Sequence, residues 1–93
     1  MTYVITIGPD ARDDLKAIYD YIQEQDSRTK AINFINELQN SINSLEFMPL
    51  RCRASIYNSD ETVRDLIYKG YTVVFKINDQ TVYILSVFRQ KAL

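Results

Sequence analysis

Two amphipathic segments that follow each other closely constrain the fold of this chain more than any other feature. In each segment, apolar residues recur at alternating spacings of four and three, the pattern of a helix with one apolar stripe. The first stripe is formed by Ala11, Leu15, Ile18 and Ile22, and the second by Ala31, Ile35, Leu38, Ile42 and Leu45. Because only two or three residues separate the helices, they must lie antiparallel.

The ends of both helices are marked by residues with clear positional preferences. Proline is tolerated in the first helical turn, where its missing N–H would have no partner, so the first helix begins near Pro9 or Asp10 and ends near Gln25. Ser27 is a suitable N-cap for the second helix. Pro49 ends that helix, because the residue before a proline is disfavoured in the α region.

Four segments alternate between apolar and polar residues, as strands do. They are Tyr3–Ile7, Val63–Tyr68, Tyr71–Ile77 and Thr81–Phe88. Lys69-Gly70 and Asn78-Asp79-Gln80 separate the last three and favour hairpin turns. The second half of the chain is therefore predicted to end in an antiparallel meander.

The stretch from Leu50 to Thr62 follows neither period and is predicted to be a loop, with a short strand near Ser55–Tyr57. The element order is then strand, helix, helix and three strands. This order predicts an α+β fold: the N-terminal strand and the C-terminal three-strand meander form an antiparallel sheet, and the helical hairpin packs on one face of it. Ninety-three residues support one hydrophobic core, so residues 1–93 are expected to form a single domain.

Composition and charge narrow the class of protein. The single cysteine, Cys52, cannot form an internal disulfide, and the chain has neither a signal-peptide pattern nor an apolar run of membrane-spanning length, so a cytoplasmic protein is expected. Residues 1–48 carry four basic and eight acidic residues, a net charge of −4, whereas residues 49–93 carry seven basic and four acidic residues, a net charge of +3. One basic face could contact an anionic partner, but the positive field of a general nucleic-acid binder is missing.

Most residues that carry catalysis or bind metals are absent from the sequence. There is no histidine, no cysteine pair and no glycine-rich phosphate loop, which excludes zinc sites, catalytic triads and nucleotide loops. No cofactor or metal is expected. The remaining candidates are Arg51, Arg53, Arg64, Arg89 and Lys91. Converging guanidinium groups clamp phosphate or carboxylate groups through paired hydrogen bonds, although solvated surface arginines explain the same pattern.

Arg64 is the most constrained candidate, since it lies in a strand between apolar neighbours, where a charge needs a partner or an open face. Its strand and that of Arg89 run in the same direction. Whether the second turn has two or three residues decides if both side chains share a face, and the sequence leaves this open. Glu46 and Tyr57 are possible acid/base groups, with a solvated carboxylate and a packed ring as the plainer interpretations.

Several stretches together resemble the toxins of the RelE/ParE superfamily. They are Asp14–Ile22, Ser41–Pro49, Arg64–Leu66 and Tyr71–Ile77, with Arg89 after the last strand. Their order and spacing cover nearly the whole chain. The resemblance implies the toxin component of a bacterial type II toxin–antitoxin module, a growth inhibitor that a cognate antitoxin neutralises in a hetero-oligomer.

Within that superfamily the cellular target differs. RelE-like members cut mRNA on the ribosome with basic residues and usually a terminal tyrosine or histidine, whereas ParE-like members inhibit DNA gyrase and are not nucleases. This chain has basic residues in similar places, Arg51, Arg53, Arg64 and Arg89, but ends without such a terminal residue. The resemblance thus favours gyrase inhibition, with a ribosome-dependent mRNA endonuclease, or an inert member that only binds antitoxin, as the alternatives. Whether the chain is an enzyme stays open.

Overall fold

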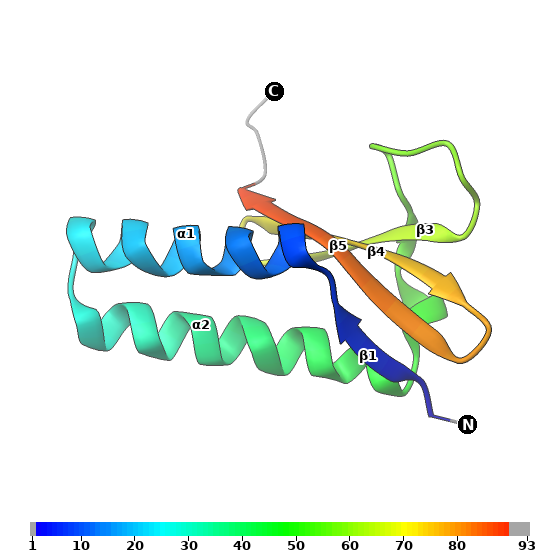
Figure 1. Cartoon of the computed structure of the whole chain (residues 1–93), viewed down its shortest axis with the longest axis horizontal. Helices are drawn as coiled ribbons and strands as arrows, with labels where there is room; N and C mark the ends of the chain where they lie inside the picture. Colours follow the sequence, from blue (N-terminus) through cyan, green and yellow to red (C-terminus); the bar gives the residue numbers. More distant parts are fainter. Residues whose placement is uncertain (1, 90–93) are drawn as a thin grey trace.

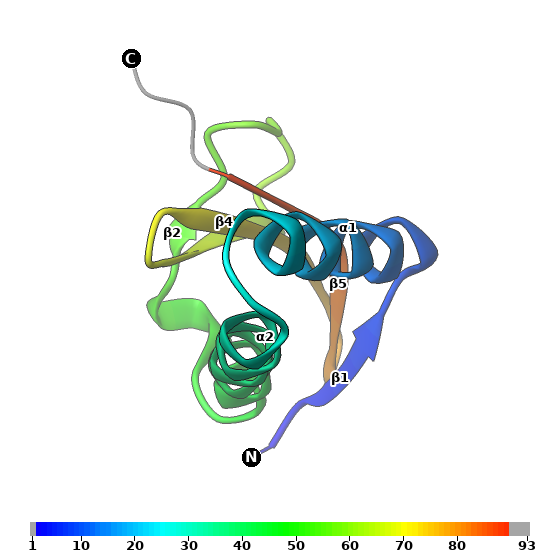
Figure 2. The ribbon, with the colours of Figure 1, turned by 90° about the vertical axis from the view of Figure 1, so that its left-hand side faces the viewer.

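The computed structural model describes residues 2–89 and confirms the expected α+β fold, with two helices packed on one face of a five-stranded sheet. The elements are β1 (Val4–Ile7), α1 (Pro9–Gln25), α2 (Arg28–Asn43), the 3-10 turns η1 (Ser44–Glu46) and η2 (Pro49–Arg51), β2 (Arg53–Ala54), β3 (Val63–Tyr68), β4 (Tyr71–Asn78) and β5 (Thr81–Arg89). Figure 1 shows the helices side by side, with the tip of their hairpin reaching beyond the sheet. Figure 2 looks along them from that tip.

Two local signals position the helices as predicted. The N–H of Gly8 donates to the carbonyl oxygen of Ile84 at 2.9 Å, and a Cβ at Gly8 would stand 2.9 Å from that same oxygen, so the step from β1 into α1 requires glycine. Pro9 then takes the first helical position. The hydroxyl of Ser27 accepts from the N–H of Lys30 at 3.1 Å, which confirms the N-cap of α2.

The second helix ends earlier than predicted. It stops at Asn43, and η1 and η2 carry the chain past Pro49, so the prediction that Pro49 ends the helix is wrong. The hydroxyl of Ser44 donates to the carbonyl oxygen of Ser41 at 2.6 Å, and this side-chain bond competes with continued α-helical pairing. Leu45, the last residue of the predicted stripe, is nevertheless fully buried.

The strand order is β1-β5-β4-β3-β2. The meander of β3, β4 and β5 is antiparallel as predicted, and β2 pairs antiparallel at its edge. β1 pairs with β5 in parallel, so the sheet is mixed rather than wholly antiparallel. A tight turn enforces antiparallel pairing only between consecutive strands, whereas β1 and β5 are connected through the whole helical hairpin and the rest of the sheet.

The short strand of the irregular segment lies at Arg53–Ala54, so its prediction near Ser55–Tyr57 is wrong. The N–H of Ser55 still donates to a main-chain carbonyl of β3 at 2.9 Å. The N–H of Ile56 instead donates to the Oδ2 atom of Asp65 at 3.2 Å. This side-chain bond takes the chain off the edge of β3 at the second residue of the predicted strand.

Both turns of the meander contain two residues. Lys69 and Gly70 connect β3 to β4 with φ angles of 45° and 83°, as a tight hairpin turn requires. In the second turn Asn78 pairs with Thr81, so the loop is one residue shorter than the predicted Asn78–Gln80 turn.

A β-bulge interrupts β5. Phe75 of β4 pairs with Ile84, but the preceding residue, Val74, pairs with Ser86, so Leu85 has no partner residue on β4. Residues 86–89 of β5 therefore face the side opposite to the one that a regular strand would give them. The bulge is what returns the end of β5 to the buried face.

The core lies between the helical hairpin and the sheet and contains residues from both predicted stripes. Its buried residues are Ala11, Ile18, Leu38, Ile42, Leu45, Cys52, Val73, Phe75, Val82, Ile84 and Val87. In the described part of the chain, no helix combines the length and the apolar character needed to cross a membrane.

Polar contacts fasten the helices to particular strands. The carboxylate of Glu37 on α2 accepts from the ammonium of Lys69 and the hydroxyl of Tyr68, both at 2.9 Å, and the bond from Lys69 is the main reason why the pKa of Glu37 is lowered. On α1, Oδ2 of Asp14 accepts from the N–H of Val87 at 2.9 Å. Because β1 has ended by that point, the Asp14 carboxylate takes the place of a strand beside β5.

Candidate functional site

Arg51 is exposed, and its guanidinium is held against the turns around it. Nη1 donates to the carbonyl oxygen of Met48 at 3.0 Å, and Nη2 donates to the hydroxyl of Ser44 at 2.9 Å. Within residues 2–89 no carboxylate pairs with it. A guanidinium has five N–H donors, so three remain for another molecule.

Arg53 pairs with a buried carboxylate. Its Nη2 atom lies 3.3 Å from Oδ2 of Asp65, whose side chain is fully buried. The same oxygen accepts from the N–H of Ile56, whereas Oδ1 is buried without a hydrogen-bond partner among the described residues. Removing Arg53 would leave the buried carboxylate of Asp65 without its ion-pair partner. The first role of Arg53 is therefore structural.

The Arg64 guanidinium contacts main-chain carbonyl groups of the segment that follows α2. Its Nη1 atom donates to the carbonyl oxygen of Cys52 at 2.6 Å and lies 3.5 Å from that of Leu50. The guanidinium thus fastens the segment after α2 to β3. The partner that the sequence required at this position is provided by main-chain carbonyls.

The arginines of β2 and β3 point in opposite directions. Arg53 pairs with Asp65, and Ala54 pairs with Arg64. Since paired residues share a face and neighbours alternate, Arg53 lies on the face away from the helices and Arg64 on the face that they cover.

Arg64 and Arg89 share the helix-covered face, which answers the question that the sequence left open. Arg64 pairs with Phe75 and Arg89 with Tyr71, and residues four apart on one strand face the same way. The bulge at Leu85 produces this result, because a regular β5 would turn Arg89 to the other side. Four residues along β4 and two strand spacings place the two Cα atoms roughly 16 Å apart. The Arg64 guanidinium is engaged by the carbonyl oxygen of Cys52, whereas Arg89 is exposed.

The two possible acid/base residues lie near opposite ends of β5. The carbonyl of Glu46 accepts from the N–H of Tyr3 at 2.7 Å, next to the strand that pairs with the beginning of β5. Tyr57 packs edge-on against Phe88 near the end of β5, with ring centroids 4.9 Å apart. They are therefore not placed to act on the same substrate.

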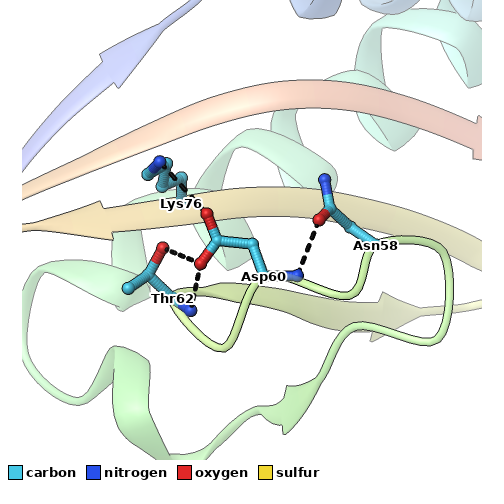
Figure 3. Close-up of polar contacts among 4 residues, drawn as sticks. All are labelled: Asn58, Asp60, Thr62 and Lys76. Atoms are coloured by element: carbon cyan, nitrogen blue, oxygen red, sulfur yellow. Dashed lines mark hydrogen bonds and ion pairs between the residues drawn. The ribbon is translucent and has the colours of Figure 1, made fainter.

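The loop that carries Tyr57 is held by a network around Asp60 (Figure 3). The carboxylate accepts from the N–H and the hydroxyl of Thr62 at 2.9 and 2.7 Å, and from the ammonium of Lys76 at 3.2 Å. The N–H of Asp60 donates to the side chain of Asn58 at 2.9 Å. Hydrogen bonds from Thr62, and then from Lys76, lower the pKa of Asp60 to about 2. The network closes the loop and attaches it to β4.

Arg89 borders an apolar cavity of about 360 Å³ beside α1. The other lining residues are Ala17, Ile18, Tyr21 and Tyr71. Arg89 is exposed, and no carboxylate within the described residues forms an ion pair with it. An apolar hollow beside a guanidinium suits an apolar side chain of a partner with a carboxylate nearby. Lys91, the last candidate, lies outside the described residues.

A second apolar cavity, of about 200 Å³, was not predicted from the sequence. It lies where α2 gives way to η1 and η2, and its lining residues are Tyr3, Phe47, Met48, Pro49, Leu50 and Arg51. The run of four apolar residues from Phe47 to Leu50, outside both helical stripes, is the signal that could have revealed it.

Residues typical of metal or thiol chemistry do not form a site in this structure. Among residues 2–89, no three histidine, cysteine, aspartate or glutamate side chains gather as metal ligands. Burial raises the pKa of the Cys52 thiol, which makes it a weak nucleophile. The candidate site therefore consists of arginines and apolar surface.

Solved structures with the same fold come from toxin–antitoxin systems. The structure of the chromosomal ParDE TA system from P. aeruginosa matches with a TM-score of 0.83 and 18% identity, over 97% of this chain and 98% of that chain. The toxin–antitoxin complex RelBE2 from Mycobacterium tuberculosis matches with a TM-score of 0.63 and 21% identity, over 97% of this chain and 100% of that chain. No curated protein matches the sequence. The fold is thus one that occurs in proteins of toxin–antitoxin systems.

A comparison of the sequence with protein families identifies one family within the toxin–antitoxin systems. Residues 5–93 match the family described as the ParE toxin of the type II toxin–antitoxin system parDE. The chain belongs to this ParE toxin family, which confirms the resemblance drawn from its motifs.

Proposed function

We propose that this chain inhibits growth by binding DNA gyrase, and that it does not cut RNA. The distribution of the arginines carries the proposal. Arg53 and Arg64 bond to their own chain on opposite faces of the sheet, whereas Arg89 is exposed beside an apolar cavity. Cleavage of RNA needs several positive groups that converge on one phosphate. A binding surface needs an apolar centre with a charged rim, as the Arg89 cavity has.

Each candidate residue has a place in this proposal. Arg89 and Lys91 contact the target, while Arg53 and Arg64 hold the segment after α2 in position. Arg51 keeps free donors at the second cavity. Glu46 and Tyr57 have no chemical role, because no bond is broken.

An antitoxin partner belongs to the same proposal. The similar structures are of a ParDE system and of a RelBE2 complex, and this chain exposes apolar side chains at both cavities. A partner segment that folds on these surfaces would cover them and prevent toxicity. Toxin, antitoxin and gyrase would meet in the cytoplasm.

The test compares an arginine of the cavity with an arginine elsewhere on the surface. Arg89→Ala should abolish growth inhibition and inhibition of gyrase supercoiling, whereas Arg12→Ala, which removes an exposed arginine of α1, should preserve both. Thermal melting checks that both variants are folded. Full toxicity of a folded Arg89→Ala variant contradicts the site assignment.

The same experiment separates the alternatives. Cleavage of ribosome-bound mRNA, detected by primer extension and lost in Arg51→Ala and Arg53→Ala, would favour a RelE-like endonuclease. Binding to an antitoxin without effect on growth, supercoiling or mRNA would identify an inert member.

A further inference from the structure

The residues around the second cavity form an exposed apolar patch. Phe47 and Met48 are each 64% exposed and Leu50 is 60% exposed. We call these three side chains together with Arg51 the Phe47 patch. Single exposed apolar side chains are common on proteins, but a contiguous group that surrounds a cavity marks an interaction site.

The backbone of η1 and η2 places the side chains of the patch at the surface. Leu45 and Pro49 take the buried positions in η1 and η2, so the residues between and after them face outward. The carbonyl of Glu46 accepts from the N–H of Tyr3 at 2.7 Å, and the N–H of Phe47 donates to Ser44 at 3.2 Å. These main-chain bonds fix the backbone that carries the exposed side chains, which reduces the backbone entropy lost on binding.

Arg51 indicates that the partner bound at the patch carries a negative charge. Its two hydrogen bonds, to Met48 and Ser44, direct the guanidinium along the edge of the patch and leave three N–H donors unused. No carboxylate of residues 2–89 pairs with it. The complementary occupant therefore carries a carboxylate close to a large apolar side chain.

The position of the patch indicates which partner this is. Tyr3, which lines the cavity, precedes the strand that pairs with the beginning of β5, while Arg89 lies at the end of β5. Nine residues of strand, roughly 30 Å, separate the two surfaces. A target that contacts only the surface around Arg89 leaves the Phe47 patch available to a second partner.

We propose that the Phe47 patch binds a segment of the antitoxin in which a large apolar side chain fills the cavity and an acidic residue beside it pairs with Arg51. This inference rests on the proposed function, because it takes the second partner to be the antitoxin. The occupant is a protein segment with one apolar anchor and one carboxylate.

The experiment uses residues 1–93 together with the cognate antitoxin, which is expected to be the protein encoded beside this chain. A Met48→Ser/Leu50→Ser double variant removes the apolar anchor site, and Arg51→Gln removes the charge. The matched control is Ile32→Ser/Ile67→Ser, which changes two exposed apolar residues of α2 and β3. Binding is measured by titration calorimetry, growth inhibition by expression with and without the neighbouring protein, and folding by thermal melting.

We expect the double variant to bind at least about tenfold more weakly and to inhibit growth even when the neighbouring protein is present. Arg51→Gln should weaken binding most at low salt, and the control should behave like the wild type. Unchanged binding by a folded double variant overturns the proposal, as does the absence of any binding by the wild-type chain. Loss of growth inhibition with binding unchanged would assign the patch to the target instead. If the wild-type chain binds its neighbour but does not inhibit growth, the proposed function fails, and the binding data still decide the role of the patch.

Discussion

Arg64 connects β3 to the segment that follows the second helix. From the sequence, Arg64→Ala is expected to leave the fold nearly intact, but the bond to the carbonyl of Cys52 at 2.6 Å changes that expectation. A hydrogen bond from a charged group contributes about 1.5–3 kcal/mol. We expect Arg64→Ala to lower the free energy of unfolding by about this amount in urea titrations, and Arg89→Ala to leave it unchanged. An Arg64→Ala variant as stable as the wild type would show that the bond to Cys52 contributes nothing.

Asp60 is expected to make the stability of the fold decrease as the pH falls. Because folding lowers its pKa from 3.8 to about 2, its contribution to stability is fully present above pH 4 and is lost as the pH falls towards 2. Asp60→Asn removes the charge that Lys76 and Thr62 stabilise. The melting temperature of the variant should therefore lie below that of the wild type at pH 6, and the difference should shrink as the pH approaches 2. A difference that stays constant over this range would exclude Asp60 as its source.

At the scale of elements, α2 contributes two fully buried large apolar residues to the core, Leu38 and Ile42. Leu38, in the middle of its stripe, is fully buried, whereas Ile32 on the same helix is 40% exposed. Leu38→Ala should lower the free energy of unfolding by about 2–5 kcal/mol, because it removes buried methyl groups and leaves a cavity. Ile32→Ala should cost much less in the same urea titration. Equal effects of the two substitutions would mean that the helix face is wrongly assigned.

The bulge in β5 can be tested as an element of its own. Deleting Leu85 lets Ser86 follow Ile84 in regular register, so Val87 and Arg89 keep their faces. We expect this deletion to preserve growth inhibition. Inserting one alanine between Val87 and Phe88 should abolish it, because Arg89 then leaves the cavity beside Tyr71. Equal toxicity of the two folded variants would show that the face of Arg89 is irrelevant.

For the molecule as a whole, the features that the sequence predicted correctly are those that depend on residues close together in the chain. The stripes of α1 and α2, the Ser27 cap and the Lys69-Gly70 turn depend on residues close in the chain, and all are confirmed. The bulge at Leu85 and the parallel pairing of β1 depend on contacts between distant residues, which periodicity does not report. The same limit explains why the faces of Arg53 and Arg64, and hence their structural partners, became visible only in the fold.

A partner should also change the stability of the whole molecule. Binding to the folded chain alone adds RT ln(1 + [L]/Kd), about 2.7 kcal/mol when the partner is present at 100 times its Kd. For a chain of this size, that corresponds to a rise in melting temperature of roughly 10–20 °C. Calorimetric scans with increasing amounts of the neighbouring protein should show this rise. A melting temperature that does not depend on its concentration would contradict an antitoxin that binds the folded chain.

The pairing of β1 with β5 also determines when the proposed Arg89 site can form during synthesis. Val4 pairs with Thr81, so the first strand waits for a partner that is synthesised 77 residues later. Val82, Ile84 and Val87, which complete the core, belong to that same last strand. Contacts between residues so far apart in the chain form late and slowly. A nascent chain that has not yet delivered β5 lacks both a finished core and the Arg89 surface, so the proposed Arg89 site forms only after β5 has been synthesised.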